Sequence, residues 1–127
     1  MSPTPNIYVA VVVDDESYCR SLGRLLRAAD FQPVTYPSAE SFLADGKHPR
    51  FDCLLLDVEL GGISGLELHR RLVAVGSTTP VIYISAHDDP ATRNAAQTAG
   101  CFAFISKVEP SDVLLKAIAS AIRPSLN

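Results

Sequence analysis

The sequence predicts an α/β fold in which five short strands alternate with five helices around one parallel sheet. Short runs of β-branched and large apolar residues recur along the chain, as strands buried on both faces require. Between these runs, apolar residues recur every three or four positions, which is the spacing of one helix face. The strict alternation of the two patterns favours a parallel sheet that carries helices on both faces.

The composition is that of one compact domain. The chain has 127 residues, of which 47% are hydrophobic and 20% charged, and its net charge is −3. This balance excludes a disordered chain and gives no sign of a protein that binds nucleic-acid phosphates. No apolar run is long enough to cross a bilayer or to act as a signal peptide, so we expect a cytoplasmic protein without direct nucleic-acid or membrane binding. Buried free thiols are the simplest interpretation of the three cysteines, Cys19, Cys53 and Cys101.

The first half of the chain predicts two strands and two helices after a flexible arm over residues 1–6. Ile7–Val13 is a short apolar run typical of a strand buried on both faces. Glu16–Ala29 has apolar residues at helical spacing, and Gln32–Tyr36 is a second, weaker strand. Ser38 is a suitable N-cap for a short helix over Ala39–Ala44.

The second half predicts three more strand–helix units. The strands are expected at Cys53–Leu56, Pro80–Ser85 and Phe102–Ile105. Ser64 and Glu67 have the spacing of a capping box that opens a helix running to about Val75. Asp89 and Pro90 form a cap and first turn for the fourth helix. Pro110 opens the last helix, whose apolar stripe is Val113, Leu114, Ala117, Ile118, Ala121 and Ile122. The expected globular domain spans residues 7–123, with no output domain in this chain.

Polar side chains gather where the predicted strands end. In open parallel sheets, binding sites lie at the carboxyl ends of the strands. The residues at these ends are Asp14, Asp15, Asp57, Ser85 and Lys107. Each alone has an ordinary explanation, since an Asp after a strand is usually a helix cap, a Ser a turn residue and a Lys a solvated charge. All of them at one edge of one sheet instead indicate a site.

The residue types at this edge suit phosphoryl transfer. Clustered carboxylates repel one another and favour a cation, and oxygen ligands favour Mg²⁺. A carboxylate can attack a phosphoryl group to give an acyl phosphate. A metal ion, a lysine and a hydroxyl are suited to hold the negative oxygens of the transferred group.

The ordered motifs resemble the receiver domains of two-component response regulators. The matching segments are Val11–Glu16, Leu54–Asp57 followed by Gly65, Val81–Ala86 and Phe104–Lys107. The resemblance covers about residues 7–122 and implies a flavodoxin-like fold, a doubly wound sheet with strand order 2-1-3-4-5. The segment Tyr36–Leu43 is similar to the nitrogen-fixation regulator subfamily.

The resemblance implies a role for each residue at the edge. Asp57 would be the phosphoacceptor. Mg²⁺ would bind to Asp15, to Asp57 and to the backbone carbonyl of Glu59, and to Asp14 largely through water. The phosphoryl oxygens would be bound by Ser85, the backbone of Ala86 and Lys107. Ser85 and Phe104 would form the switch. His87 is expected at the mouth of the site.

The resemblance also implies partners. The phosphodonor would be a sensor histidine kinase, a phosphotransfer protein or a small phosphodonor. The face formed by the fourth helix, the fifth strand and the fifth helix would bind an output partner or a second copy of the chain. Catalysis would be limited to the domain's own phosphorylation and dephosphorylation.

Two positions depart from the family's pattern. The family usually has proline four residues after the acceptor, where this chain has Gly61, and directly after the lysine, where it has Val108. Both changes remove rigidity beside the site. A cis bond before a residue other than proline costs about 3–4 kcal/mol, so we expect a trans bond between Lys107 and Val108. We also expect this loop to hold Lys107 less firmly.

Two other classes of protein stay open as alternatives. A phosphate-independent pseudo-receiver would be a pure binding module, and only Gly61 and Val108 favour it. A phosphatase similar to haloacid dehalogenases would carry Asp-x-Asp after a strand, whereas Asp57 is followed by Val58 and Glu59. Mass spectrometry after treatment with a small phosphodonor separates the three classes.

The remaining candidates have simpler interpretations. His48 lies in a Lys-His-Pro loop and His69 on a helix, and neither has a partner at ligand spacing, so both are interpreted as surface histidines. Phe102 and Phe104 alternate along one strand, and both are expected in the core.

Overall fold

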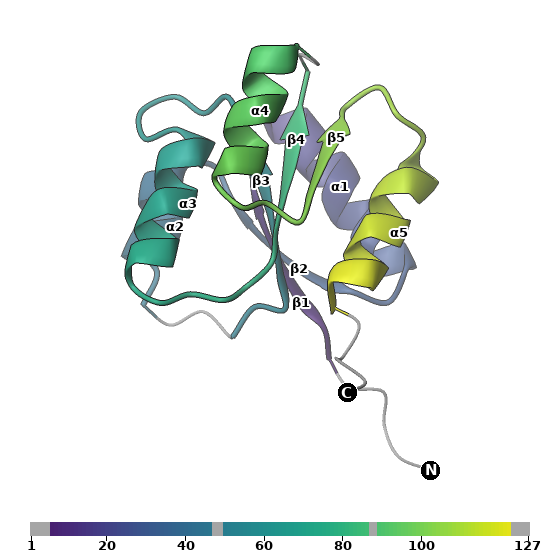
Figure 1. Ribbon diagram of the computed structural model, residues 1–127. Helices are drawn as coiled ribbons and strands as arrows, with labels where there is room; N and C mark the ends of the chain where they lie inside the picture. Colours follow the sequence, from purple (N-terminus) through teal and green to yellow (C-terminus); the bar gives the residue numbers. More distant parts are fainter. Residues whose placement is uncertain (1–5, 47–49, 87–88, 123–127) are drawn as a thin grey trace, which may run out of the picture.

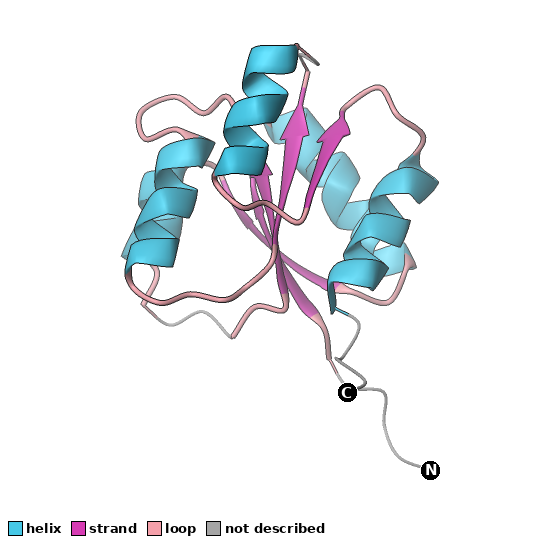
Figure 2. Ribbon diagram, in the orientation of Figure 1, coloured by secondary structure: helices cyan, strands magenta, loops and turns pink. Residues whose placement is uncertain are grey.

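A computed structural model describes residues 6–46, 50–86 and 89–122. It contains one parallel sheet of five strands in the order β2-β1-β3-β4-β5 (Figures 1 and 2). The strands are β1 (Tyr8–Val12), β2 (Gln32–Tyr36), β3 (Cys53–Asp57), β4 (Val81–Ser85) and β5 (Ala103–Ser106). The helices are α1 (Glu16–Ala28), α2 (Ala39–Ala44), α3 (Gly65–Ala74), α4 (Pro90–Thr98) and α5 (Ser111–Ile122). The predicted fold class and strand order are confirmed.

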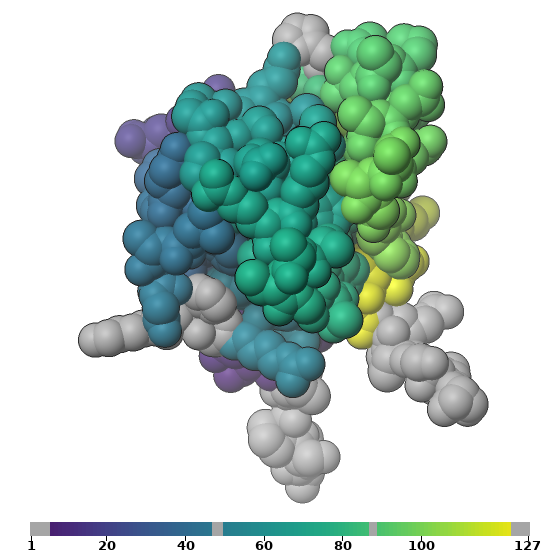
Figure 3. Space-filling view, turned by 60° about the vertical axis from the view of Figure 1, so that its left-hand side comes forward, coloured from purple at the N-terminus to yellow at the C-terminus, as the bar shows by residue number. Residues whose placement is uncertain are grey.

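The helices cover both faces of the sheet, so its three central strands are almost free of solvent. On one face, α1 and α5 pack over a core that includes Leu26, Leu55 and Ile118. On the other, α2, α3 and α4 lie next to one another at the surface (Figure 3) over a core that includes Leu56 and Leu68. Burial on both faces explains why the strands read as continuous apolar runs.

Several predicted helix ends are confirmed, because the caps satisfy backbone groups that the first and last turns leave free. Ser38 and Ser41 form a reciprocal capping box at α2. Asp89 accepts a hydrogen bond from the Thr92 amide, with Pro90 in the first turn of α4. Gly100 follows α4 with a φ of 90°, a conformation that glycine adopts without steric cost.

The capping box predicted at α3 is only half formed. The Ser64 hydroxyl accepts a hydrogen bond from the Glu67 amide. The Glu67 carboxylate does not return to the Ser64 amide, because it pairs with Arg71 at 3.2 Å and with Arg70 at 3.6 Å. Two arginines within one turn of the carboxylate are stronger partners than a single amide.

Several burial predictions are wrong. Phe102 precedes β5 and is 49% exposed, because it lies in the connection between the end of α4 at Thr98 and the start of the strand at Ala103. Val113 lies at the edge of its helix stripe and is 36% exposed. Of the three free thiols, Cys53 is buried, whereas Cys19 and Cys101 are only partly buried.

Some predicted features fall on residues that the structure does not describe. Residues 1–5, His48 and His87 lie outside the described residues, so the flexible arm and two of the histidine interpretations stay predictions. Among the helices in the described ranges, none is long and apolar enough to cross a membrane.

Candidate functional site

The centre of the candidate site is an ion pair between β3 and β5. Asp57 is the last residue of β3 and is 3% exposed. Its Oδ2 atom lies 2.8 Å from the Nζ atom of Lys107, which follows β5. The Glu59 amide donates a hydrogen bond of 2.9 Å to the other oxygen, Oδ1. Because β4 lies between the two strands, the Lys107 side chain crosses the sheet edge to reach this carboxylate.

Asp14 and Asp15 follow β1, the strand next to β3, and both are exposed. Asp15 is the N-cap of α1, and its Oδ1 atom accepts a hydrogen bond of 3.0 Å from the Tyr18 amide. The interpretation of Asp15 as a helix cap is therefore correct. This cap uses Oδ1, and a carboxylate has a second oxygen that can bind a ligand, so capping and ligand binding are compatible.

Gly61 contributes a contact that the usual proline cannot make. The Gly61 amide donates a hydrogen bond of 3.3 Å to Oδ2 of Asp14. Proline has no N–H, so this contact between the loop after β3 and the end of β1 depends on the departure from the family's pattern.

A second side chain, besides Asp14, binds the loop after β3, and the sequence did not predict this contact. Oε2 of Glu40, on α2, accepts a hydrogen bond of 2.9 Å from the Ile63 amide. This backbone hydrogen bond is the main cause that lowers the pKa of Glu40. The loop that carries Glu59 is thus held on one side by Asp14 and on the other by Glu40. A contact between a helix side chain and a distant loop amide has no local sequence pattern.

Ser85 lies on β4, the strand next to the acceptor strand β3, and Phe104 lies on β5, one strand further along the sheet. Ser85 ends β4 with no exposed surface, and its carbonyl accepts a hydrogen bond of 2.8 Å from the Lys107 amide. Ala86, directly after it, is exposed. Phe104 is partly buried and pairs with Tyr83 across β4 and β5, under the guanidinium of Arg93, which lies 4.7 Å from its ring centroid.

The turn after Lys107 has the geometry expected from the missing proline. No cis peptide bond occurs among the described residues, so the bond between Lys107 and Val108 is trans, as predicted. The Glu109 amide closes the turn on the Ser106 carbonyl at 3.1 Å. Lys107 is nonetheless engaged from two sides, by Asp57 and by the ring of Tyr18, whose centroid lies 4.7 Å from Nζ. The side chain of Lys107 is thus held by contacts outside the turn, although the turn lacks the usual proline.

The donor set fits a Mg²⁺ ion that keeps much of its water. In the part of the chain that the structure describes, no three His, Cys, Asp or Glu side chains converge closely enough to form a metal site. Mg²⁺ does not require such a cage, because it usually takes one or two carboxylates and several waters. Asp14, Asp15 and Asp57 supply oxygen donors at one edge, and the Glu59 carbonyl belongs to the adjacent loop.

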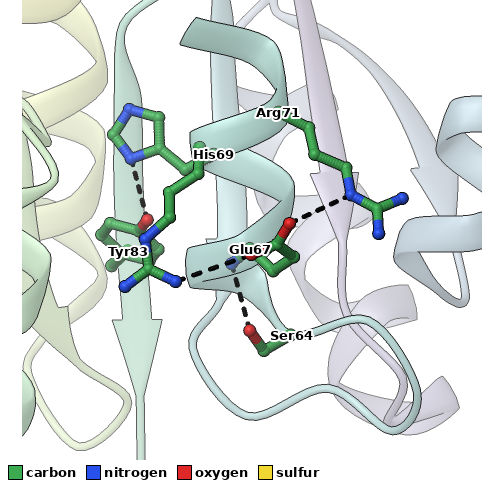
Figure 4. A network of polar contacts seen from close by, with 6 residues as sticks. Ser64, Glu67, His69, Arg71 and Tyr83 are labelled. Carbon is green, nitrogen blue, oxygen red and sulfur yellow. Dashed lines mark hydrogen bonds and ion pairs between the residues drawn. The ribbon is translucent and has the colours of Figure 1, made fainter. Parts of the chain in front are cut away.

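His69 is buried, so its interpretation as a surface histidine is wrong. It is 4% exposed on α3, and its Nδ1 atom lies 2.8 Å from the hydroxyl of Tyr83 on β4 (Figure 4). The reason is that a hydroxyl buried at the centre of the sheet needs a polar partner. Glu67 and Arg71 on the same helix, with Ser64 as its N-cap, form the more exposed contacts in Figure 4. Burial lowers the pKa of His69 from its ordinary value of 6.5.

This shift predicts how stability depends on pH. The folded state holds His69 neutral to a lower pH than the unfolded chain does, so the unfolded chain binds more protons just below pH 6.5. Stability is therefore lost as the pH falls below that value. His69→Gln keeps a polar partner for Tyr83 without titrating. In denaturant titrations between about pH 7.5 and pH 5, wild type is expected to lose more stability than this variant. Equal losses would contradict the prediction.

Comparison with known proteins assigns the family. The sequence matches the response regulator receiver domain over residues 9–119. It is 33% identical to the response regulator protein TmoT of Ectopseudomonas mendocina over 91% of this chain and 52% of that protein. It is 36% identical to the transcriptional regulatory protein FixJ of Azorhizobium caulinodans over 93% of this chain and 54% of that protein. The crystal structure of FixJ-N superposes with a TM-score of 0.86 at 31% identity, covering 98% of this chain and 99% of that one.

The chain belongs to the response regulator receiver domain family, the signalling modules of two-component systems. The similarity to FixJ agrees with the resemblance of Tyr36–Leu43 to the nitrogen-fixation regulators. The chain spans about half the length of the curated relatives that it matches.

Proposed function

We propose that this domain is a phosphorylation-operated switch that accepts a phosphoryl group on Asp57. The observation that carries the proposal is the ion pair of 2.8 Å between the buried Asp57 carboxylate and Lys107 at the carboxyl edge of the sheet. A carboxylate at the end of a central strand lies at the edge where the binding sites of parallel sheets form, and its charge is already paired with a cation of the kind that transferred oxygens need. The domain boundaries 7–123 and a cytoplasmic location stay predictions.

The reaction is an in-line displacement at phosphorus. An Asp57 oxygen bonds to the phosphorus of a phosphohistidine, from a sensor histidine kinase or a phosphotransfer protein, or of a small phosphodonor. The phosphorus–nitrogen or phosphorus–oxygen bond of the donor breaks, its electron pair stays with the leaving group, and an acyl phosphate remains. Lys107 exchanges its carboxylate oxygen for a phosphoryl oxygen. The Ser85 hydroxyl and the Ala86 amide bind the other oxygens.

The acidic residues of the site would hold Mg²⁺. Asp15, Asp57 and the Glu59 carbonyl are the direct ligands in this proposal, and Asp14 acts through water. The ion, when bound, neutralises charge on the transferred phosphoryl group. The exposed carboxylates of Asp14 and Asp15 repel each other without it, and they also repel an anionic donor.

Mg²⁺ is expected to raise the melting temperature of the domain by a few degrees. A ligand that binds only the folded state stabilises it by about 1.4 kcal/mol at ten times its Kd. Asp15→Asn removes one charge, but it keeps an oxygen that caps α1, because Asn is as good an N-cap as Asp. This variant is expected to lose most of the Mg²⁺ effect in thermal melts with and without the ion. A full Mg²⁺ response in the variant would exclude Asp15 as a ligand.

Output passes in this proposal from Ser85 to the face formed by α4, β5 and α5. Ser85 and the residues after it move toward the phosphoryl oxygens, which opens space beside β4. Phe104 lies next to this space and turns inward, which changes the face that binds an output partner or a second copy. Phe104 is partly buried, and two ring positions of similar energy would make it the bistable element that this route requires.

This route predicts where chemical shifts change. Beryllofluoride, a phosphoryl mimic, is expected to shift the amide signals of α4 and β5 when it occupies Asp57. The amides at the start of β2, at the opposite end of the strands from Asp57, serve as the internal control. An unchanged α4 and β5 at full occupancy would show that the output takes another route.

Intact-mass spectrometry after treatment with acetyl phosphate and Mg²⁺ tests the proposed function. A persistent adduct of one phosphoryl group supports it. The absence of any adduct would favour the pseudo-receiver, and release of phosphate in large excess over protein would favour a phosphatase.

A further inference from the structure

Lys107 reaches its partner across a strand, because β4 separates β5, which Lys107 follows, from the strand that carries Asp57. Neighbouring strands lie about 4.8 Å apart, so the side chain spans roughly twice that distance along the sheet edge. Fixing a lysine side chain costs up to about 2 kcal/mol of conformational entropy. A further contact of the ammonium group therefore affects the fraction of time that this group spends paired with the Asp57 carboxylate.

The turn after Lys107 supplies little of this support. Val108 is 88% exposed, and it replaces the proline that would stiffen the backbone here. The inner side of the lysine borders a cavity of about 140 Å³ between α1 and α5, which Tyr18 and Glu109 also line. An ammonium group that left the Asp57 carboxylate would find open space in this cavity, which the exposed Glu109 also lines.

The Tyr18 ring occupies the position from which this movement is restrained. Its centroid lies 4.7 Å from Nζ of Lys107, well within the range of a cation–π contact. The ring is partly buried against the core of the α1 face, and the amide of the same residue is bound by the Asp15 carboxylate. Burial raises the pKa of the Tyr18 hydroxyl, and the negative charge of Asp57 raises it further, so the hydroxyl stays neutral.

We propose that Tyr18 is a positioning residue, whose ring holds the ammonium group of Lys107 over Asp57 while that group exchanges a carboxylate oxygen for a phosphoryl oxygen. The contact is with the ring face, so it persists through the exchange, whereas the ion pair with Asp57 does not. This inference rests on the proposed phosphorylation of Asp57 and names a further residue that serves it. The proposal also links α1 to the reaction, because Asp15 and Tyr18 lie in one cap.

The test compares two apolar substitutions of Tyr18. Tyr18→Phe keeps the ring and removes the hydroxyl, whereas Tyr18→Leu removes the ring and keeps an apolar side chain. The rate of adduct formation with acetyl phosphate and Mg²⁺ is measured by intact mass. Tyr18→Leu is expected to be about three- to tenfold slower than wild type, the range that one cation–π contact supports, and Tyr18→Phe is expected to stay within about twofold.

Two further measurements separate positioning from a general loss of structure. In a Lys107→Met background, Tyr18→Leu is expected to leave the residual rate nearly unchanged, whereas a purely structural role would slow both backgrounds alike. The Lys107 Hε signals are expected to carry an upfield ring-current shift in wild type and Tyr18→Phe that disappears in Tyr18→Leu. Thermal melts show whether each variant is folded.

The outcomes distinguish this inference from the function on which it rests. A wild-type rate in Tyr18→Leu, or equal slowing in both Tyr18 variants, overturns the positioning role while the adduct on wild type still stands. If wild type forms no adduct, the proposed function fails. The ring-current comparison then still decides whether Tyr18 holds Lys107.

Discussion

Asp57→Asn is expected to abolish labelling of the domain by acetyl phosphate. The amide that replaces the carboxylate keeps the size of the side chain but is a poor nucleophile and lacks the charge that pairs with Lys107 at 2.8 Å. The predicted effect is the complete loss of the phosphoryl adduct in an intact-mass spectrum, and no other aspartate is expected to take over.

Asp30→Asn is the matched control for this loss. Asp30 lies after α1, at the opposite end of the helix from the site, with a φ of 69° that Asn also tolerates. Labelling of this control at the wild-type level, beside an unlabelled Asp57→Asn, is the expected pair of results. Full labelling of Asp57→Asn would exclude Asp57 as the acceptor.

Gly65→Ala is expected to destabilise the domain by about 1–3 kcal/mol, the usual cost of forcing extra volume into a filled site. Gly65 is the first residue of α3 and is buried against the end of β3. A Cβ atom at this position would collide with the carbonyl oxygen of Asp57 and would contact the backbone of Val58. The helix start would have to move away from the strand that ends in the acceptor, so slower labelling is expected as well.

Gly61→Ala provides the comparison in the same loop. A Cβ atom at Gly61 meets nothing within 4 Å, and alanine keeps the amide that binds Asp14. Denaturant titration is expected to place this variant within about 0.5 kcal/mol of wild type. A Gly65→Ala protein as stable as Gly61→Ala would show that α3 can shift away from β3 at little cost.

The fold could be predicted from the sequence because its local patterns agree with one another. Apolar runs such as Cys53–Leu56 appear only where a strand is covered on both faces, and caps such as Asp89 mark helix starts. The predicted site residues follow the ends of strands. Because parallel strands end at one edge of the sheet, their positions after the strands were enough to predict that they lie together. Phe102 was misplaced because the period of a strand does not show where the strand starts.

Other contacts of the site depend on tertiary structure. The hydrogen bond from Ile63 to Glu40 joins segments 23 residues apart and leaves no local pattern. The cation–π contact of Tyr18 joins the first turn of α1 to Lys107 after β5, so it can be seen only once the fold brings these two segments together. His69 had a usable signal, because it shares the buried face of α3 with Gly65 and Leu68 at helical spacing.

Mapping the phosphorylated residue tests the central claim most directly. Borohydride reduces an aspartyl phosphate to homoserine, so the modified position can be read by peptide mass spectrometry after treatment of the wild-type domain with acetyl phosphate and Mg²⁺. We predict homoserine at position 57 and at no other aspartate. Homoserine at Asp14 or Asp15 with an unmodified Asp57, or a phosphoryl group on a side chain away from this edge, would contradict it.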